Sequence, residues 1–206
     1  MLSTSERSPM HGLVNRALQC FLRDTFGTEV WRDIAQAAGA PPDGFEPMLR
    51  YPPDLTLAVI AAAARLLDRP REALMEDLGT YLVSNPGREG LRRLLRFGGV
   101  EFADFLYSLD DLPGRGRLAV PDLDLPQLEL EDAGNGHFAL TVHGPWPDFA
   151  PVMVGVLRAM ADDYGALALA ELVDDDGPDG ARRIAIDLFD ARFAAGRRFD
   201  LSAGST

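Results

Sequence analysis

The sequence has one cysteine and no long hydrophobic run, and both absences limit what the protein can be. Cys20 alone supports neither an internal disulfide nor a metal site built from several cysteines. The longest apolar-rich stretch, residues 55–67, is too short and too interrupted to cross a bilayer. Residues 1–9 are polar, and the apolar core of a signal peptide does not follow them. We therefore expect a cytoplasmic protein without membrane association.

Basic residues are scarce. The 206 residues include 20 Lys and Arg against 32 Asp and Glu, for a net charge of -12. Nucleic-acid binding requires clustered Lys and Arg to neutralise phosphates, so we expect no nucleic-acid partner. The hydrophobic content of 47% is sufficient for one large domain with a core.

The motifs of common enzyme classes are absent as well. There is no Gly-x-Ser-x-Gly elbow, no Walker loop and no His-Glu-x-x-His zinc motif. Because no nucleophile–base pair can be identified, we expect no catalytic activity. Gly114-Arg115-Gly116-Arg117 has the charge to hold an anion, but pairing of its two arginines with nearby aspartates is the simpler interpretation.

Helical spacing of apolar residues dominates the first half of the sequence. In residues 11–23 the apolar side chains recur on one face, and Asn85-Pro86-Gly87 is typical of a helix end. This pattern predicts helices over residues 11–23, 28–38, 54–67, 70–83, 91–97 and 100–110.

The pattern changes to strands after Leu112. Residues 128–131 and 138–143 flank Gly134-Asn135-Gly136, a strong hairpin signal, and a helix over 150–162 precedes two further strands over 166–173 and 182–188. We predict an α+β fold in which a helical part precedes a four-stranded antiparallel sheet with one inserted helix. The expected organisation is a disordered leader (1–9), one domain (10–190) with a helical part (10–112) and a sheet part (113–190), and a loose tail (191–206).

Five short motifs follow one another between residues 10 and 112. They are Met10-His11-Gly12-Leu13-Val14; Phe26-Gly27 with Trp31; Leu78-Gly79-Thr80-Tyr81-Leu82; Leu91-Arg92-Arg93-Leu94-Leu95 with Gly98-Gly99; and Phe105-Leu106-Tyr107-Ser108-Leu109-Asp110-Asp111-Leu112. In these motifs, and in the order of helices and strands, the chain resembles the heme–nitric oxide binding (H-NOX) domain family over roughly residues 10–188. The resemblance implies a gas-sensing domain that holds heme b between its helical part and its sheet.

The same resemblance shows that the family's heme-attachment residues are replaced here. In the family, a proximal histidine follows the Leu-Asp-x-Leu segment, and a Tyr-x-Ser-x-Arg strand motif binds the propionates. These positions correspond to Pro113 and to Val142, Gly144 and Trp146. Proline offers no axial donor and is expected to end the helix that presents the ligand. Because propionates need charged donors, we expect a heme site that was abandoned or converted.

The remaining candidate residues follow from the same comparison. Among the three histidines, His11 is the best candidate for a substitute ligand, although a buried histidine bonded to a backbone carbonyl is the expected role. His137 and His143 share the strand face opposite Val142, so we expect them at the surface. Residues expected to line the former pocket are His11, Leu13, Tyr107, Leu109 and Pro126, the last of which corresponds to a proline that packs against the porphyrin in the family.

Two hypotheses remain open. The first is a sensory or regulatory H-NOX-like domain without standard His-ligated heme. It would signal in trans to a partner such as a diguanylate cyclase or a histidine kinase, as the resemblance implies. The second is a heme-independent module whose remodelled pocket binds an apolar ligand or another protein. Val142 and Trp146 in place of polar propionate contacts favour this alternative.

Overall fold

The computed structural model describes residues 9–144, 146, 148–176 and 180–193. The predicted leader, apart from Pro9, and most of the predicted tail lie outside the described residues. Helices fill the first half of the chain, as the apolar spacing predicted. They are α1 (Gly12–Phe26), α2 (Thr28–Ala38), α3 (Pro53–Leu66), α4 (Arg71–Ser84), α5 (Glu89–Arg96), α6 (Phe102–Tyr107) and α7 (Leu112–Ala119), with a 3-10 turn, η1 (Pro86–Arg88).

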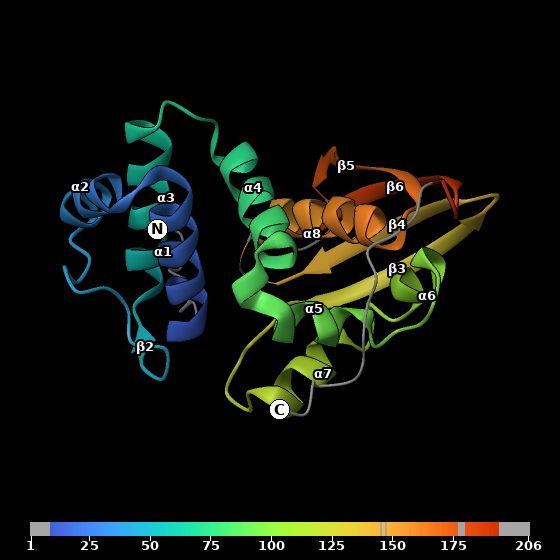
Figure 1. Ribbon diagram of the computed structural model, residues 1–206, viewed down its shortest axis with the longest axis horizontal. Helices are drawn as coiled ribbons and strands as arrows, with labels where there is room; N and C mark the ends of the chain where they lie inside the picture. The colour runs from blue at the N-terminus through green and yellow to red at the C-terminus, as the bar shows by residue number, and fades with distance from the viewer. Residues whose placement is uncertain (1–8, 145, 147, 177–179, 194–206) are drawn as a thin grey trace, which may run out of the picture.

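The second half forms a four-stranded antiparallel sheet, so the predicted α+β class is confirmed. Its strands are β3 (Gln127–Gly134), β4 (His137–His143), β5 (Leu167–Asp176) and β6 (Arg182–Asp190), in the order β3-β4-β6-β5. Helix α8 (Phe149–Tyr164) lies across one face of this sheet (Figure 1). A separate pair of two-residue strands, β1 (Met10–His11) and β2 (Arg50–Tyr51), joins the start of α1 to the segment before α3.

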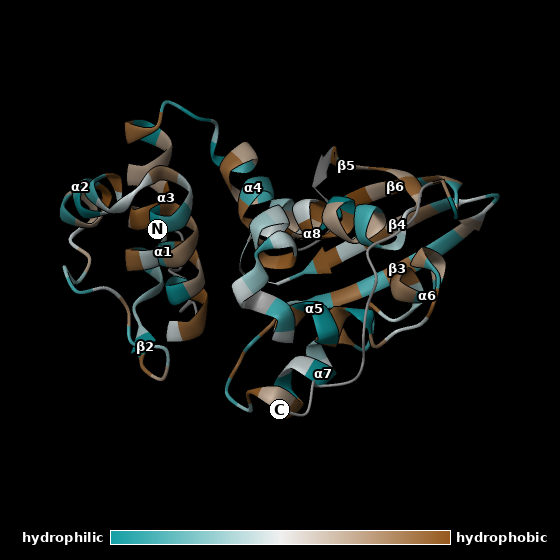
Figure 2. Ribbon diagram, in the orientation of Figure 1, coloured by the Kyte–Doolittle hydropathy of each residue, from teal (hydrophilic) through white to brown (hydrophobic). Residues whose placement is uncertain are grey.

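The β3–β4 hairpin turns where the sequence predicted. Asn135 has a positive φ of 55°, and Gly134 and Gly136 both have φ of 82°. A Cβ on Gly136 would lie 2.4 Å from the Leu188 carbonyl oxygen of β6, so this turn requires glycine for space as well as for conformation. Along β3 and β4, Figure 2 shows brown and teal bands, as expected for strands with one buried face.

Helix α7 is the element that the sequence pattern did not predict. Pro113 was expected to end a helix, but it lies in the first turn of α7, after α6 has already ended at Tyr107. The first turn tolerates proline because its N–H would have no intrahelical acceptor. The sequence pattern did not predict this helix, because Gly114 and Gly116 interrupt the helical spacing of apolar residues. Gly116 lies close to the next segment, since a Cβ there would lie 2.7 Å from Leu125 Cδ1 and the Leu125 side chain would have to move.

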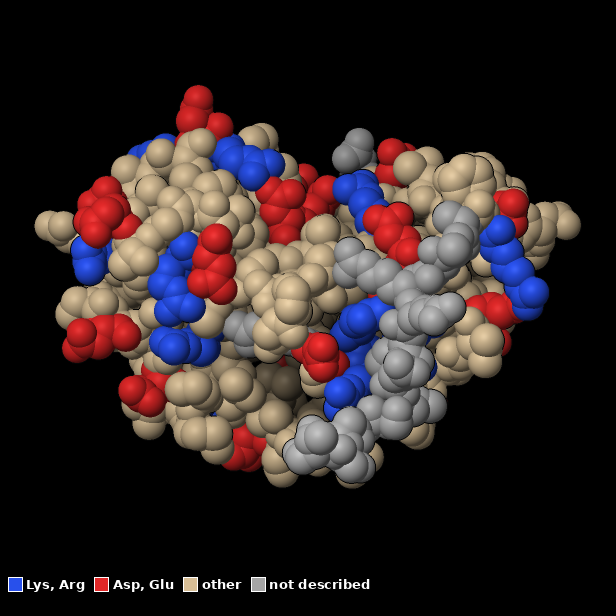
Figure 3. Space-filling view, in the orientation of Figure 1, with Lys and Arg blue, Asp and Glu red and all other residues tan. Residues whose placement is uncertain are grey.

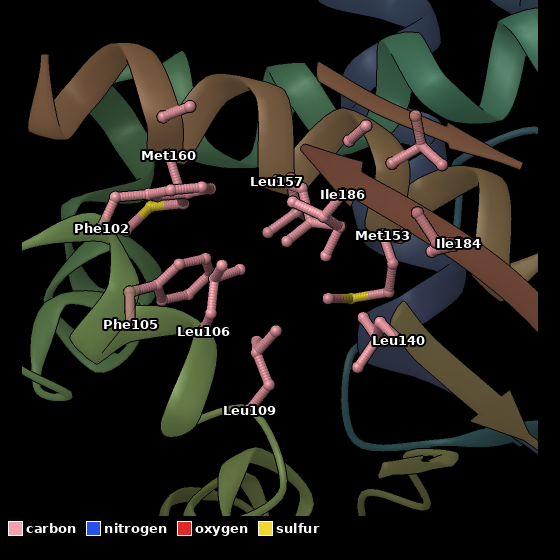
Figure 4. Packing of buried hydrophobic residues seen from close by; sticks show 14 of the residues in the cluster. Phe102, Phe105, Leu106, Leu109, Leu140, Met153, Leu157, Met160, Ile184 and Ile186 are labelled. Carbon is pink, nitrogen blue, oxygen red and sulfur yellow. The ribbon is translucent and has the colours of Figure 1, made fainter. Parts of the chain in front are cut away.

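The buried side chains form two separate hydrophobic cores. One lies among α1, α2, α3 and the facing side of α4, and the other joins the sheet to α8 and to α5–α7. Figure 4 shows the second core, in which Leu109 and Leu140 approach Met153 of α8. In Figure 1, α1–α3 stand on one side and the sheet on the other, with α4 between them. The described residues include no helix long and apolar enough to cross a membrane.

Helices α4 and α8 cross at two glycines. A Cβ on Gly79 would lie 2.0 Å from the Val152 carbonyl oxygen, and a Cβ on Gly155 would lie 1.9 Å from that of Glu76. Any larger residue at either position must push the two helices apart. The crossing therefore fixes the position of the sheet half relative to α4.

We predict that Gly155→Ala destabilises the protein. Although alanine favours helix by up to about 1 kcal/mol over glycine, overpacking of backbone against backbone costs about 1–3 kcal/mol, so the net effect is a loss. Chemical denaturation of both proteins measures the difference. Gly90→Ala in α5 is the control, because nothing lies within 4 Å of its added Cβ, and it should stabilise slightly. Equal stabilisation by both substitutions would contradict this account of the crossing.

Candidate functional site

Pro113 and its neighbours are buried in α7, beside the sheet half. Leu112, Pro113 and Gly116 form the buried side of this helix. The proline nitrogen belongs to a peptide bond and has no lone pair available for a metal. Pro113, which the resemblance predicts at the family's axial-ligand position, is therefore a packed side chain that offers no donor to a metal.

The positions that the resemblance assigns to the propionate motif lie at the end of β4 and directly after it, and none carries a charged side chain. Val142 is 4% exposed and pairs with Leu128 and Arg182 across the sheet. Gly144 follows with a φ of 150°, and a Cβ there would lie 3.2 Å from Pro126 Cβ. Trp146 is half-buried, and its carbonyl accepts a hydrogen bond from the Phe149 N–H at 3.1 Å. The side chains at positions 142, 144 and 146 therefore place no charge where propionates would need one.

The three histidines do not present an axial donor at these positions. His11 is buried at 5% exposure, but it caps α1: its Nδ1 accepts the Leu13 N–H at 3.2 Å, in place of the expected bond to a carbonyl. His137 and His143 lie on the outer sheet face, as strand parity predicted. They contact Asp187 at 2.6 Å and Glu129 at 3.2 Å, respectively.

Two of the residues expected to line the former pocket, Tyr107 and Leu109, lie in other parts of the structure. Tyr107 is 55% exposed, with its ring edge against Phe138, so it does not line an interior cavity. Its hydroxyl donates to Asp132, and this bond raises the pKa of Tyr107 and lowers that of Asp132, which also accepts the Gly134 N–H. Leu109 is fully buried in the core between the sheet and α8, where Figure 4 shows it near Leu106.

A group of half-buried apolar side chains belongs to neither hydrophobic core. Helix α1 and the segment between α7 and β3 carry several of them, and in Figure 1 the lower end of α1 and this segment lie at the lower middle of the molecule. Figure 3 shows the surface hollowed in this lower middle region. We call this hollow the gap, and we call seven of these residues the gap lining: Leu13, Val14, Ala17, Val120, Leu123, Leu125 and Trp146.

Arg50 bridges the gap at its edge. Its guanidinium donates to the Asp122 carbonyl at 2.9 Å and to the Pro9 carbonyl at 3.4 Å. Arg50 belongs to β2 of the helical half, whereas Asp122 lies in the segment between α7 and β3. This contact holds the two sides of the gap lining together.

The hydrogen bonds of Arg115 were not predicted from the sequence. The expected pairing of Arg115 with aspartate is wrong, because its guanidinium contacts Ser108 and the Leu94 carbonyl instead. Among the described residues, no cluster of three or more His, Cys, Asp or Glu could hold a metal ion.

Comparison with known proteins decides the family. The sequence model of the Haem-NO-binding family matches residues 11–168 of this chain. The chain belongs to the heme–nitric oxide binding (H-NOX) family. The resemblance inferred from the five motifs is thereby confirmed, and this H-NOX chain belongs with the sensor domains of that family.

Individual relatives are distant in sequence and close in fold. The H-NOX chain is 21% identical to soluble guanylate cyclase 89Db of Drosophila melanogaster, over 80% of this chain and 24% of that protein. It therefore spans about a quarter of the curated relatives' length. A mutant H-NOX domain of T. tengcongensis superposes with a TM-score of 0.73, at 16% identity, over 88% of this chain and 99% of that one. An oxygen-binding H-NOX domain related to soluble guanylate cyclases gives 0.70, at 16% identity, over 92% and 100%.

The residues of this H-NOX chain do not fit His-ligated heme. A heme iron needs an axial donor such as imidazole or thiolate, and propionates need charged donors. Pro113 supplies no donor, and Val142 and Gly144 supply neither charge nor hydroxyl. We therefore derive no signalling step through an iron–histidine bond.

We predict that Tyr107→Phe raises the pKa of Asp132, because the substitution removes the hydroxyl that stabilises its carboxylate. The Gly134 N–H remains, so one of the two hydrogen bonds that lower this pKa is kept. A pKa that is lowered in the folded state adds stability above the usual Asp pKa and loses it as the pH falls through the folded pKa. Carboxyl ¹³C titration by NMR measures the shift, and the Asp187 carboxyl is the control. An unchanged Asp132 titration would contradict the assigned cause.

Proposed function

We propose that this chain is a sensory or regulatory H-NOX domain that works without His-ligated heme and signals to a partner in trans. The observation that carries the proposal is Pro113, buried in the first turn of α7 where the family has its iron ligand. The simultaneous replacement of the propionate-binding positions by Val142, Gly144 and Trp146 supports it, because one chance substitution does not explain both losses.

The proposed partner is a signalling enzyme, by analogy with the relatives. The matching proteins are named as soluble guanylate cyclases, and this chain corresponds to about a quarter of their length. Such a portion fits a regulatory role better than a catalytic one, and we propose that the chain itself catalyses no reaction. A nucleotide cyclase, such as a diguanylate cyclase, or a histidine kinase is the proposed recipient of the signal.

The gap lining supports a second candidate function, the binding of an uncharged apolar ligand. The seven side chains of the gap lining are half-buried and lie outside the two cores, although apolar surface of this kind is usually buried against other apolar groups. A pocket lined mainly by apolar side chains is typical of small-molecule sites. Without charged donors for propionates, such a pocket would favour neutral molecules over heme.

We predict that protein produced with ample heme is colourless. Expression with added heme precursor, followed by absorption spectroscopy and a hemin titration, should give no stoichiometric Soret band, because no axial donor is available. An H-NOX domain that retains its proximal histidine, prepared in parallel, is the control for heme supply. A stoichiometric band that shifts on addition of nitric oxide would overturn the heme-free proposal. If a band appears, His11→Ala tests the one buried histidine as its ligand.

We also predict that the neutral dye Nile red binds the gap lining. Leu13→Asn should weaken binding by roughly tenfold, because it removes most of a buried apolar side chain from the site. Leu169→Asn is the matched control, since Leu169 is 41% exposed on the outer face of the sheet. Fluorescence titration of the three proteins measures the affinities. Equal weakening by both substitutions, or by neither, would exclude the gap lining as the binding site.

A further inference from the structure

Helix α7 has little of its own to hold it in place. It contains eight residues, two of which are glycines, and isolated helices of this length are unstable in water. Asp111 precedes it without a side-chain capping bond. Its packing rests on Leu112, Pro113 and Gly116. An additional contact is needed to fix such a helix, and in a heme-holding family member the iron–histidine bond lies at this position.

Arg115 supplies a contact of this kind. One guanidinium nitrogen donates to the Ser108 carbonyl at 2.7 Å and to its Oγ at 3.1 Å, and another donates to the Leu94 carbonyl at 3.4 Å. Ser108 is the C-cap of α6, and Leu94 lies in the last turn of α5. A single side chain of α7 thus connects it to the ends of the two preceding helices.

The electrostatics of this contact are favourable. The last four carbonyls of a helix lack intrahelical donors, and the C-terminal end carries a partial negative charge. A guanidinium placed between the C-terminal ends of α5 and α6 satisfies carbonyls from both. Bonds that involve a charged group are stronger than neutral ones. By contrast, Arg117 on the same helix is exposed and, among the described residues, forms no hydrogen bond or ion pair.

We propose that Arg115 is the positioning residue of α7, and that its bonds to Ser108 and Leu94 hold this helix without an iron–histidine bond. The proposal rests on the heme-free function proposed above. Release of these bonds frees α7 and the segment that follows it, which Arg50 connects to the helical half through the Asp122 carbonyl. Arg115 therefore connects α7 to α5 and α6, while Arg50 connects the segment after α7 to the helical half.

Native-state hydrogen exchange tests the proposal on the full chain. The reporters are the amides of Arg115 and Val120, which donate to Asp111 and Gly116 at 2.9 Å. In Arg115→Met, these amides should exchange roughly tenfold faster, because the charged hydrogen bonds are lost locally. The amides of α8 should exchange at the wild-type rate. Arg117→Met is the matched control and should leave α7 unchanged.

Three further variants separate positioning from general stability. Arg115→Lys keeps the charge but loses the planar set of N–H donors of the guanidinium. The exchange rate of its α7 amides should therefore lie between those of the wild type and Arg115→Met. Ser108→Ala removes one acceptor only and gives a smaller acceleration, which keeps the test available if Arg115→Met does not fold. Low concentrations of methylguanidinium should slow α7 exchange in Arg115→Ala, a rescue that a merely space-filling role would not produce.

The outcomes are distinct. Wild-type α7 exchange in Arg115→Met, or equal acceleration in α7 and α8, would overturn the assignment of Arg115. The absorption spectrum of the same wild-type sample reports on heme independently. A stoichiometric Soret band there would refute the heme-free function while the exchange rates still decide the role of Arg115.

Discussion

The contact between α4 and α8 is the constraint on which the rest of the structure depends. Gly79 and Gly155 allow the two backbones to approach so closely that neither position has room for a side chain. Helix α4 contributes to both hydrophobic cores, and Val152 of α8 packs against both as well. The crossing therefore places the helical half relative to the sheet half, and with it the width of the gap that holds the candidate site.

Much of the fold could be predicted from the sequence because local signals agreed with the final packing. Residues 28–38 form a helix with the predicted bounds, and the Gly134-Asn135-Gly136 turn forms the predicted hairpin. Helix α7 could not be predicted in this way, because two glycines and a proline suppress every local helix signal. Tertiary contacts decide there instead: Gly116 is accommodated against Leu125, and Arg115 reaches two other helices.

The candidate site was only partly accessible to sequence reasoning. The assignment of positions 113, 142, 144 and 146 to the family's motifs rests on the resemblance and stays a prediction, whereas strand parity correctly placed His137 and His143 outside. The position of Tyr107 was missed, because the short helix α6 turns it outward to Asp132. Likewise, no sequence pattern reveals that a guanidinium will prefer backbone carbonyls to the many carboxylates nearby. The acceptors of the Arg115 guanidinium depend on which helix ends lie next to it in the folded protein.

The bridge between Arg50 and the Asp122 carbonyl has a consequence for how freely this region can vary. Since the acceptor belongs to the main chain, the side chain at 122 contributes nothing to the bond, and almost any amino acid there would preserve it. The bond therefore depends on the side chain of a single residue, Arg50 of the two-residue strand β2. Substitutions in the segment before β3 can therefore change the side chains at the edge of the gap, and with them the molecules that can enter it. The bond between Arg50 and the main chain would still connect the two halves.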